Sequence, residues 1–587
     1  MATAAALKSI ESLSGVDARM EALDRLERLT DEAAAEIARH RSNVLLKRGI
    51  RSWRRGEIVR AGQWALKATE MDDSNAKAFH VLAMALERMG HLHKALVTYE
   101  RAFQLDPEDP ELLINLGLTA WNLKMTEGAA RMFQLYVDAC PDSPLGYNNL
   151  GSVLYDLGHL ETAIETLRAA IFRMPNEAIL WNSLATVLAE EGRAEESLVF
   201  YDEAVRLEPG FARGYHNLGY AYQHLGRLED GLENYDRALE HAVDPTERLE
   251  SRHSRSICLI GAGKLEEGFK EYEIRNNERF RAYFHHVIKA PRWNGEPVEG
   301  LKLLLSGEQG LGDEFMFANI LPDVIRDLGP DGKLQIAVDP RLVKLFQRSF
   351  PEAEVGTYDD RTLIDNDGNK ALRLIPFASN GNEPDMWAPM GSALQVYRKK
   401  ISDFPHQAFI KPDPLRVAEF REMLAKLPGK KVGVCWRSMM LQAKRAKYFS
   451  PIDGWAPVLK TEGVSFINLQ YGDCAQEIAR AAEQHGVTIH QIEGLNLRDD
   501  IDGTAALCAA LDLVLSAPTA AAATAASVGT EVWFLAAGRT WPQLGTDEYP
   551  WYAKTRVLSP DRFGDWATLM PDVSAKLAKF ARIKAGK

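Results

Sequence analysis

The sequence LLLSGEQGLGDE, residues 303–314, decides the fold of the second half of the chain. A short apolar run ends abruptly in a loop that holds three glycines. Residues 314–327 then place large apolar side chains at helical spacing on one face. This order predicts a buried strand, a tight turn and a helix, which together open an α/β domain.

The glycine-rich turn also carries the first candidate for chemistry. In open α/β sheets ligands bind beyond the carboxyl ends of the strands, so a ligand is expected at this turn. Gly310 and Gly312 allow close backbone approach, and the N-terminus of a helix favours an anion. Asp313 and Glu314 are the first titratable groups that such a ligand would meet, so we predict a catalytic role for them. A plain turn in which Asp313 is the N-cap of the helix fits the same pattern.

Length, charge and cysteine content exclude several classes of protein. A chain of 587 residues is too long for one core and indicates several domains or lobes. A net charge of −12 argues against a nucleic-acid-binding protein and against binding to an anionic membrane surface. Five scattered cysteines give no disulfide framework and fit a reducing compartment. The sequence has neither a secretory signal nor an apolar run of about 18 residues, so we expect a cytoplasmic protein without membrane insertion.

A period of 34 residues runs through the first half of the chain. The period links the prolines Pro107, Pro141, Pro175 and Pro209, the small residues Ala83, Gly117, Gly151, Ala185 and Gly219, and the large residues Tyr99, Phe133, Leu167, Tyr201 and Tyr235. A small residue where two helices touch, an aromatic residue on the second helix and a closing proline are typical of the tetratricopeptide repeat (TPR). We predict a helical lead-in at 1–41 and a TPR superhelix at 42–280. Its five clear repeats start near residues 76, 110, 144, 178 and 212, with weaker repeats on either side.

Stacked TPR helix pairs form a concave groove that grips another chain. Equivalent positions on the first helices of four repeats hold Asn115, Asn149, Ser183 and Asn217. Asparagine amides one repeat apart can bond to the backbone of an extended peptide, because each amide offers a donor and an acceptor. We therefore predict that these four residues bind a protein acceptor. The alternative, that they are solvated polar positions without a special role, stays open.

Strands and helices alternate through the second half, which predicts two α/β lobes at 281–411 and 412–587. In the second lobe a basic loop with Arg437, Lys444 and Arg445 follows the first strand. A later strand delivers Pro518-Thr519 to the alanine-rich helix 520–528, where a phosphate can approach bare backbone N–H groups. Tight helix packing and an ordinary solvated loop are the alternative explanations for these two features. Two lobes with a phosphate site in the second describe the GT-B glycosyltransferase plan, and another two-lobe nucleotide enzyme is the rival.

Several motifs resemble bacterial proteins that fuse TPRs to a GT-B domain. The motifs are Pro291-Arg-Trp-Asn-Gly-Glu-Pro, Gly307-Glu-Gln-Gly-Leu-Gly-Asp313, Val432-Gly-Val-Cys-Trp436, Leu469-Gln470, Asp502-Gly-Thr-Ala-Ala506, Leu511-Asp512 and Trp551-Tyr552. The motifs occur in the order found in that family, and the resemblance covers nearly the whole chain. The second half is similar to the lipopolysaccharide heptosyltransferases and, in overall plan, to O-GlcNAc transferase. Among such fusions the chain most resembles the flagellin glycosyltransferases of flagellated bacteria.

The resemblance implies roles for particular residues. Asp313 matches the proposed general base of the heptosyltransferases, and the loop from Pro518 to Ala520 matches their donor phosphate site. Many of the relatives carry Asp-Thr-Ala-x-x-His at that loop, whereas this chain has Pro518 and Ala523 in the Asp and His positions. This departure weakens the expectation of a diphosphate donor and suits a donor with one phosphate. The predicted donor-binding residues are Gly310, Gly312, Trp436, Arg437, Lys444, Arg445, Gln470, Tyr471, Pro518, Thr519 and Ala520.

The resemblance implies a metal-independent protein O-glycosyltransferase that needs no cofactor besides its nucleotide-sugar donor. The expected reaction moves a nonulosonic acid of the pseudaminic-acid type from its CMP-activated form to serine or threonine of flagellin. The TPR region would bind the flagellin, and whether a secretion chaperone presents it stays open. The alternatives are a non-catalytic TPR scaffold with a degenerate GT-B domain, and a transferase that uses another nucleotide sugar or a glycan or lipid acceptor.

Overall fold

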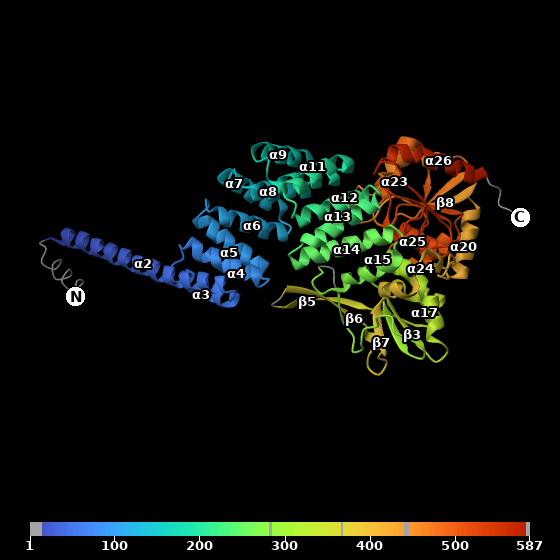
Figure 1. Ribbon diagram of the computed structural model, residues 1–587, viewed down its shortest axis with the longest axis horizontal. Helices are drawn as coiled ribbons and strands as arrows, with labels where there is room; N and C mark the ends of the chain where they lie inside the picture. The colour runs from blue at the N-terminus through green and yellow to red at the C-terminus, as the bar shows by residue number, and fades with distance from the viewer. Residues whose placement is uncertain (1–14, 281–283, 366–367, 440–444, 446, 583–587) are drawn as a thin grey trace. The chain divides into compact units, whose positions relative to one another are not determined.

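The structure is a computed structural model, and it describes residues 15–280, 284–365, 368–439, 445 and 447–582 (Figure 1). The chain divides into two compact units. The first is Met1–Pro175 together with Ile364–Asn369, and the second is Asn176–Leu363 together with Lys370–Lys587. Within the described ranges, no helix has the length and apolar character that a membrane crossing requires.

The first unit is a stack of antiparallel helix pairs. Its helices are α2 (Val16–Arg54), α3 (Ile58–Met71), α4 (Ala76–Arg88), α5 (Leu92–Leu105), α6 (Pro110–Asn122), α7 (Thr126–Ala139), α8 (Pro144–Asp156) and α9 (Leu160–Arg173). Three of them start at the predicted repeat starts 76, 110 and 144. The predicted boundary at 41/42 is wrong, because it falls inside the continuous 39-residue helix α2. The lead-in and the first helix of the degenerate repeat are therefore one helix.

The 34-residue period has the physical cause that the sequence indicated. A Cβ atom on Gly117 would lie 2.6 Å from the Phe133 ring, and one on Gly151 would lie 2.8 Å from the Leu167 side chain. Each glycine thus lets the large residue 16 positions later pack directly onto the backbone of the preceding helix. Phe133 and Leu167 are fully buried as a result.

The second unit begins with further helix pairs. They are α10 (Ala178–Glu190), α11 (Ala194–Leu207), α12 (Ala212–His224), α13 (Leu228–His241), α14 (Pro245–Gly261) and α15 (Leu265–Tyr272), followed by the 3-10 turn η1 (Glu273–Asn276). The predicted starts at 178 and 212 are confirmed. Helix pairs therefore continue to residue 272, and after η1 the chain enters the first α/β lobe.

The first lobe contains a parallel four-stranded sheet of order β4-β3-β2-β7. Its strands are β2 (Lys302–Ser306), β3 (Lys333–Val338), β4 (Glu354–Thr357) and β7 (Met386–Pro389). One face packs against α16 (Leu311–Phe317), α17 (Leu321–Leu328) and α18 (Val343–Ser349). A three-stranded sheet of β1 (Phe284–Val287), β6 (Gly368–Leu374) and β5 (Asp359–Asp365) completes the lobe. The strand–helix alternation expected throughout the lobe therefore stops at β4.

The second lobe contains a parallel six-stranded sheet of order β10-β9-β8-β11-β12-β13. Its strands are β8 (Lys430–Cys435), β9 (Val464–Asn468), β10 (Ile489–His490), β11 (Leu513–Ser516), β12 (Val532–Leu535) and β13 (Thr555–Leu558). In chain order this is 3-2-1-4-5-6, the order of doubly wound sheets, whose ligand crevice lies where the winding reverses. Here that crevice lies between the carboxyl ends of β8 and β11.

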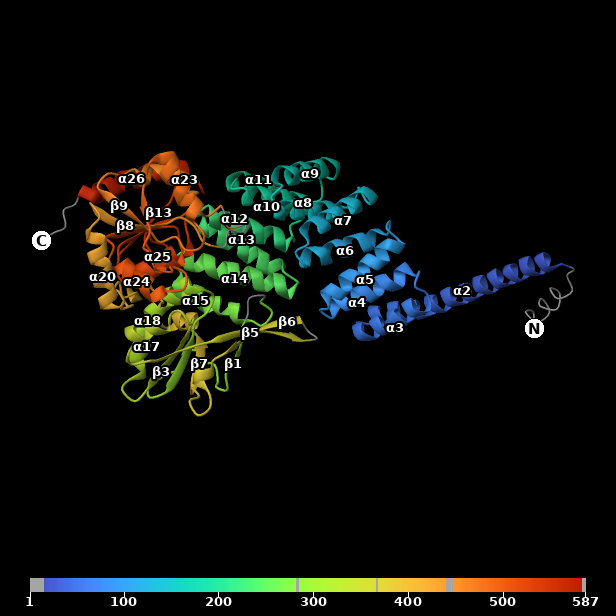
Figure 2. The same ribbon diagram turned by 180° about the vertical axis from the view of Figure 1, so that it is seen from behind.

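Both faces of the second sheet are covered, which explains its apolar strands. The helices α20 (Pro414–Ala425), α24 (Ile501–Ala509) and α25 (Ala520–Ser527) share a core with one face. The helices α22 (Ala456–Leu459), α23 (Ala475–His485) and α26 (Trp566–Arg582) share a core with the other. Figure 2 shows α23 and α26 on one side of the strands and α20 and α24 on the other. The remaining short elements are α19 (Leu394–Tyr397) and 3-10 turns at Ala318–Ile320, Pro376–Ala378, Met390–Ala393, Ile401–Asp403, Ile452–Trp455 and Trp541–Gln543.

Candidate functional site

Asp313 lies in the first turn of α16, directly after the glycine-rich turn. The N-cap of α16 is Gly310, whose carbonyl accepts from the N–H groups of Asp313 at 3.0 Å and Glu314 at 2.9 Å. The alternative in which Asp313 itself caps the helix is therefore wrong, and the helix begins three residues earlier than expected. Because α16 has only seven residues, we assign no anion site to its N-terminus. The left-handed residue of the turn is Gln309, with φ 65°, whereas Gly310 is extended.

The environment of Asp313 disfavours its charge. Burial raises the pKa of this carboxyl from 3.8 to about 7, and the nearby negative charge of Glu308 adds to the shift. The backbone N–H groups at Gly310 and Asp313 and the charge of Arg445 act in the opposite direction. The side chain is only half-buried, so it can still meet a ligand. A carboxyl group that titrates near neutral pH can serve as a general base or acid there.

Glu314 has a different place from the one predicted. Its side chain is 1% exposed, and its carboxylate accepts from the Tyr358 hydroxyl at 2.7 Å and from the Asp339 N–H at 3.1 Å. A Cβ atom on Gly307 would lie 2.6 Å from the Glu314 carboxyl carbon. Glu314 therefore braces the turn from inside the core, burial raises its pKa to about 7, and the catalytic role expected for it stays a prediction.

The crevice of the second sheet holds Thr519, as the sequence indicated. Thr519 is the N-cap of the eight-residue helix α25, and its hydroxyl accepts from the Ala522 N–H at 3.4 Å. The same hydroxyl lies 3.1 Å from Ser516 Oγ at the end of β11 and 3.6 Å from Cys435 Sγ at the end of β8. The side chain thus caps the helix and bridges the two strands. What remains for an anion is the backbone at the start of α25.

The two predicted loci lie against each other. Helix α16 packs on α25, and a Cβ atom on Gly312 would lie 3.8 Å from the Ala520 Cα atom. The structure therefore brings Gly312, which precedes Asp313 in the first lobe, against Ala520 at the start of α25 in the second. Pro518, beside them, is exposed.

Three predicted donor-binding side chains brace the second lobe instead. Gln470 accepts from the Trp436 N–H at 3.1 Å and the Arg437 N–H at 3.0 Å, and its amide donates to the carbonyls of Arg437 and Tyr471. The Trp436 indole is fully buried and donates to Glu477 at 3.0 Å. The Arg437 guanidinium also pairs with Glu477. These contacts hold the three side chains within the lobe, and donor binding by the three residues stays a prediction.

The remaining donor-binding predictions concern Tyr471, Arg445 and Lys444. Tyr471 is half-buried beside the loop after β8. Arg445 is exposed, and it lies close enough to Asp313 to influence that carboxyl. Lys444 lies outside the described residues. Sequence reasoning also missed Glu308, for which the only signal was its place in the glycine-rich turn.

The predicted groove residues show two kinds of environment. In the first unit, Asn115 Nδ2 lies 3.0 Å from His80 Nε2, and Asn149 is buried with no hydrogen-bond partner for its Nδ2 among the described residues. In the second unit, Asn217 donates to Asn182 at 3.0 Å and Ser183 donates to the carbonyl of its own helix turn. Asn115 and Asn217 therefore each contact a residue of the preceding repeat.

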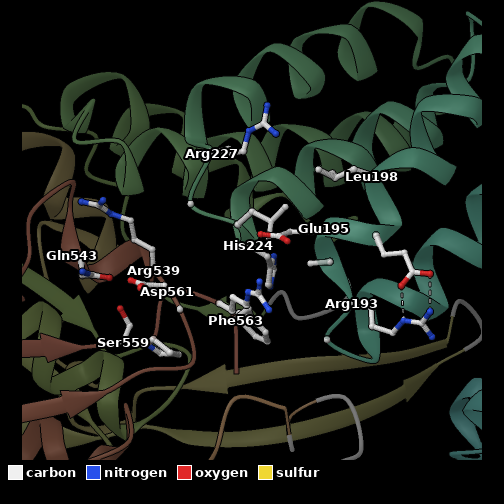
Figure 3. Close-up of a pocket in the computed structure, with 18 of the residues that line it drawn as sticks. Arg193, Glu195, Leu198, His224, Arg227, Arg539, Gln543, Ser559, Asp561 and Phe563 are labelled. Carbon is white, nitrogen blue, oxygen red and sulfur yellow. Dashed lines mark hydrogen bonds and ion pairs between the residues drawn. The ribbon is translucent and has the colours of Figure 1, made fainter. Parts of the chain in front are cut away.

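Each unit also has a sizeable cavity. One of about 570 Å³ in the first unit is lined by Trp53, Lys77, His80, Met84 and Asp109 among others. One of about 770 Å³ in the second unit lies between the turns that precede α11 and α13 and the loops after β12 and β13 (Figure 3). Its lining carries both signs of charge and none of the predicted site residues. This mixed lining gives no specific indication of a phosphate.

Comparison with known proteins places the chain in a family. Tetratricopeptide repeat models match residues 76–119, 148–212 and 200–233. Solved structures with similar repeats include YrrB, described as a TPR protein with an unusual peptide-binding site (25% identity, 32% of this chain, 97% of that chain, TM-score 0.24). Another is a thermophilic TPR protein of Thermus thermophilus (27% identity, 30% of this chain, 98% of that chain, TM-score 0.27). Protein FlbA of Caulobacter vibrioides is 40% identical over 575 residues, which cover 97% of this chain and 95% of FlbA. The chain therefore belongs to the family of Protein FlbA, as a TPR array followed by two lobes with parallel sheets.

Proposed function

We propose that the chain is a protein O-glycosyltransferase whose two lobes form a GT-B domain. The donor is a CMP-activated nonulosonic acid of the pseudaminic-acid type, and the acceptor is a serine or threonine of flagellin bound by the repeats. The sugar, the nucleotide and flagellin follow from the sequence resemblance. The observation that carries the proposal is that Asp313, whose pKa burial raises to about 7, lies in the turn of α16 where Gly312 approaches Ala520 at the start of α25.

The proposed step is a single displacement. The Asp313 carboxylate accepts the proton of the acceptor hydroxyl, which is a poor nucleophile until it is deprotonated. The hydroxyl oxygen forms a bond to the anomeric carbon, and the bond from that carbon to the phosphate oxygen breaks. CMP leaves with the bonding electrons, and the N–H groups at the start of α25 stabilise its phosphate. Arg445, which is exposed and influences the Asp313 carboxyl, adds positive charge near Asp313.

The pKa of Asp313 suits this role. With a pKa of about 7, the carboxyl is ionised above neutral pH and can take up a proton from the acceptor. A base with a pKa near the working pH combines the correct protonation state with sufficient basicity. We therefore expect transfer activity to rise with pH through about 7 as Asp313 loses its proton.

The repeats supply the acceptor. The cavity around His80 and the Nδ2 atom of Asn149, which has no hydrogen-bond partner among the described residues, offer polar groups to an extended chain in the first unit. When the acceptor and the donor bind to the same protein, the effective concentration of the acceptor at the donor rises. This favours transfer to a weakly nucleophilic hydroxyl.

The intact mass of flagellin tests the proposal. Flagellin is co-expressed with this protein and a nonulosonic-acid pathway, with Asp313→Asn as the variant and Asp331→Asn, an exposed carboxylate of the same lobe, as the matched control. We expect a ladder of masses at the sugar increment for the wild type and the control, and unmodified flagellin for Asp313→Asn. Normal modification by Asp313→Asn would refute the assignment of the base. A ladder of masses at the increment of another sugar would change the identity of the proposed donor and would still support the proposed reaction.

A non-catalytic scaffold is the second candidate. It is favoured by the observation that Trp436, Arg437 and Gln470 all bond within the lobe and that Ala523 stands in the histidine position. A scaffold would retain flagellin without changing its mass and would hydrolyse no nucleotide sugar. Release of CMP from the donor by the purified protein separates the two candidates.

A further inference from the structure

The first sheet also has a point at which its winding reverses, between β2 and β7. In such sheets the ligand crevice lies at this point, beyond the carboxyl ends of the strands. Here a side chain closes it. Glu308, in the turn after β2, accepts at 2.7 Å from the N–H of Gly391, in the turn after β7. The position that would receive a ligand in the first lobe is therefore occupied by the chain itself.

Arg275 completes this closure. Its Nε and Nη2 atoms donate to the two oxygens of Glu308 at 2.9 and 2.8 Å, which is the bidentate geometry of a strong ion pair. Its Nη1 atom donates to the Tyr272 carbonyl at 3.1 Å and to Glu273 at 2.7 Å. The Arg275 side chain is only 6% exposed. Since Arg275 lies in η1, directly after the last repeat helix, the repeat array reaches into the crevice of the first lobe.

Tyr272 makes a second contact from the same place. Its hydroxyl accepts from Gln309 Nε2 at 2.5 Å, and its ring lies 4.3 Å from the Arg275 guanidinium. Gln309 is the residue of the glycine-rich turn with left-handed backbone, a conformation that costs free energy for a residue other than glycine. The hydrogen bond that Gln309 donates to Tyr272 therefore helps to hold this turn in its conformation.

We propose that Arg275 and Tyr272 are positioning residues, which hold the turn 307–313 and so fix Asp313 for transfer. The end of the repeat array then acts as part of the catalytic lobe. The reaction in this statement rests on the proposed function, whereas the positioning itself does not.

The pKa of Asp313 depends on the charged groups around it, so a measurement in solution can report this arrangement. Burial alone would raise the pKa of Glu308, but the Arg275 guanidinium and the Gly391 N–H outweigh it and hold that pKa below 4.5. Glu308 is thus ionised and raises the pKa of Asp313, while Arg445 lowers it. Tyr272 and Tyr552 also face Asp313, and both stay neutral because burial raises their pKa values. Removing the charge of Glu308 therefore lowers the pKa of Asp313.

Three variants of the full-length protein test the proposal. Arg275→Met combined with Glu308→Gln removes the ion pair and leaves no unpaired charge, and Tyr272→Phe removes one hydroxyl. Arg255→Met is the matched control, because Arg255 pairs with Glu271 and Asp236 within the repeats and not with the turn. The measurements are hydrogen–deuterium exchange of residues 303–317 and the dependence of transfer on pH.

For the double variant we expect loss of exchange protection across the turn. We also expect a fall of kcat of about 100-fold at unchanged donor KM, since misplacement of a reacting group by about 1 Å costs that much. The acid limb of its pH profile moves to lower pH. Tyr272→Phe gives a smaller loss of protection, and Arg255→Met gives none. Wild-type protection in both the double variant and Tyr272→Phe overturns the proposal. If the wild-type protein transfers no sugar, the proposed function is overturned. The hydrogen–deuterium exchange of the variants then decides by itself whether Arg275 and Tyr272 hold the turn.

Discussion

Asp313→Asn should make the protein more stable at the same time as it abolishes transfer. Asparagine has nearly the same shape as aspartate but carries no charge, so the substitution removes only the cost of keeping a carboxylate in this environment. In the folded protein the pKa of Asp313 is raised from 3.8 to about 7, chiefly by burial. The folded state therefore binds this proton more tightly than the unfolded state does. The contribution of Asp313 to the stability of the wild type therefore falls as the pH rises from about 4 to about 7, and it stays reduced above that.

The shift sets the size of the effect. A difference of about three pKa units at about 1.4 kcal/mol per unit gives about 4 kcal/mol above neutral pH. The Asp313 side chain is only half-buried, so screening by water reduces this to about 2 kcal/mol. A pH of 5 is only about one unit above the pKa of the carboxyl in the unfolded state. The expected difference in stability at this pH is therefore about 1 kcal/mol after the same reduction. Below pH 4 the variant and the wild type should be equally stable.

Denaturant midpoints at pH 5 and pH 8 measure this, with Asp331→Asn as the control for an exposed carboxylate. We expect the midpoint of Asp313→Asn to exceed that of the wild type, and the excess to be about twice as large at pH 8. A variant that is no more stable than the wild type at pH 8 would refute the reasoning about burial and Glu308. Loss of transfer together with a gain in stability would identify a residue kept for function at a cost in stability.

Two further substitutions probe the bracing of the site. Gln470→Ala should destabilise the second lobe by about 3 kcal/mol, because it leaves buried backbone groups without partners; an unchanged melting temperature would contradict the bracing role. Gly307→Ala should cost about 1–3 kcal/mol, since the new Cβ atom would lie 2.6 Å from the buried Glu314 carboxyl. Gly312→Ala is the control for Gly307→Ala, because its Cβ atom would lie at an ordinary contact distance of 3.8 Å from its nearest neighbour.

The repeats were predictable to the residue because their signal is redundant. Five repeats carry a small residue and a large residue at the same two positions and four carry the closing proline, so an error in one register is corrected by the others. The boundary at 41/42 had no such support, and the continuous helix α2 passes through it. The start of α16 was missed by three residues because Gly310 and Asp313 are both acceptable N-cap residues in the sequence.

The site was predictable only in part, for a physical reason. A polar residue at the end of a strand either faces a ligand or satisfies the backbone of the turn, and sequence position does not distinguish these roles. Arg437 pairs with Glu477, which comes 40 positions later, and Glu308 pairs with Arg275, which precedes it by 33 positions. Asp313 and Thr519 were identified because a motif surrounds each of them. The packing of α16, which carries Asp313, on α25, which Thr519 caps, is shown only by the structure.

The charges of the two lobes indicate how the substrates divide between them. Both sheets reverse their winding after the first three strands, so each has one crevice at the carboxyl ends of its strands. In the first lobe that crevice is filled by Glu308 and Arg275, and the neighbouring surface carries Asp313. An anion approaching the first lobe therefore meets the Asp313 carboxyl beside a crevice in which Arg275 already neutralises Glu308. In the second lobe the crevice ends at the start of α25, which attracts an anion. In the proposed reaction the phosphate of the donor thus binds to the second lobe and the neutral hydroxyl of the acceptor approaches the first.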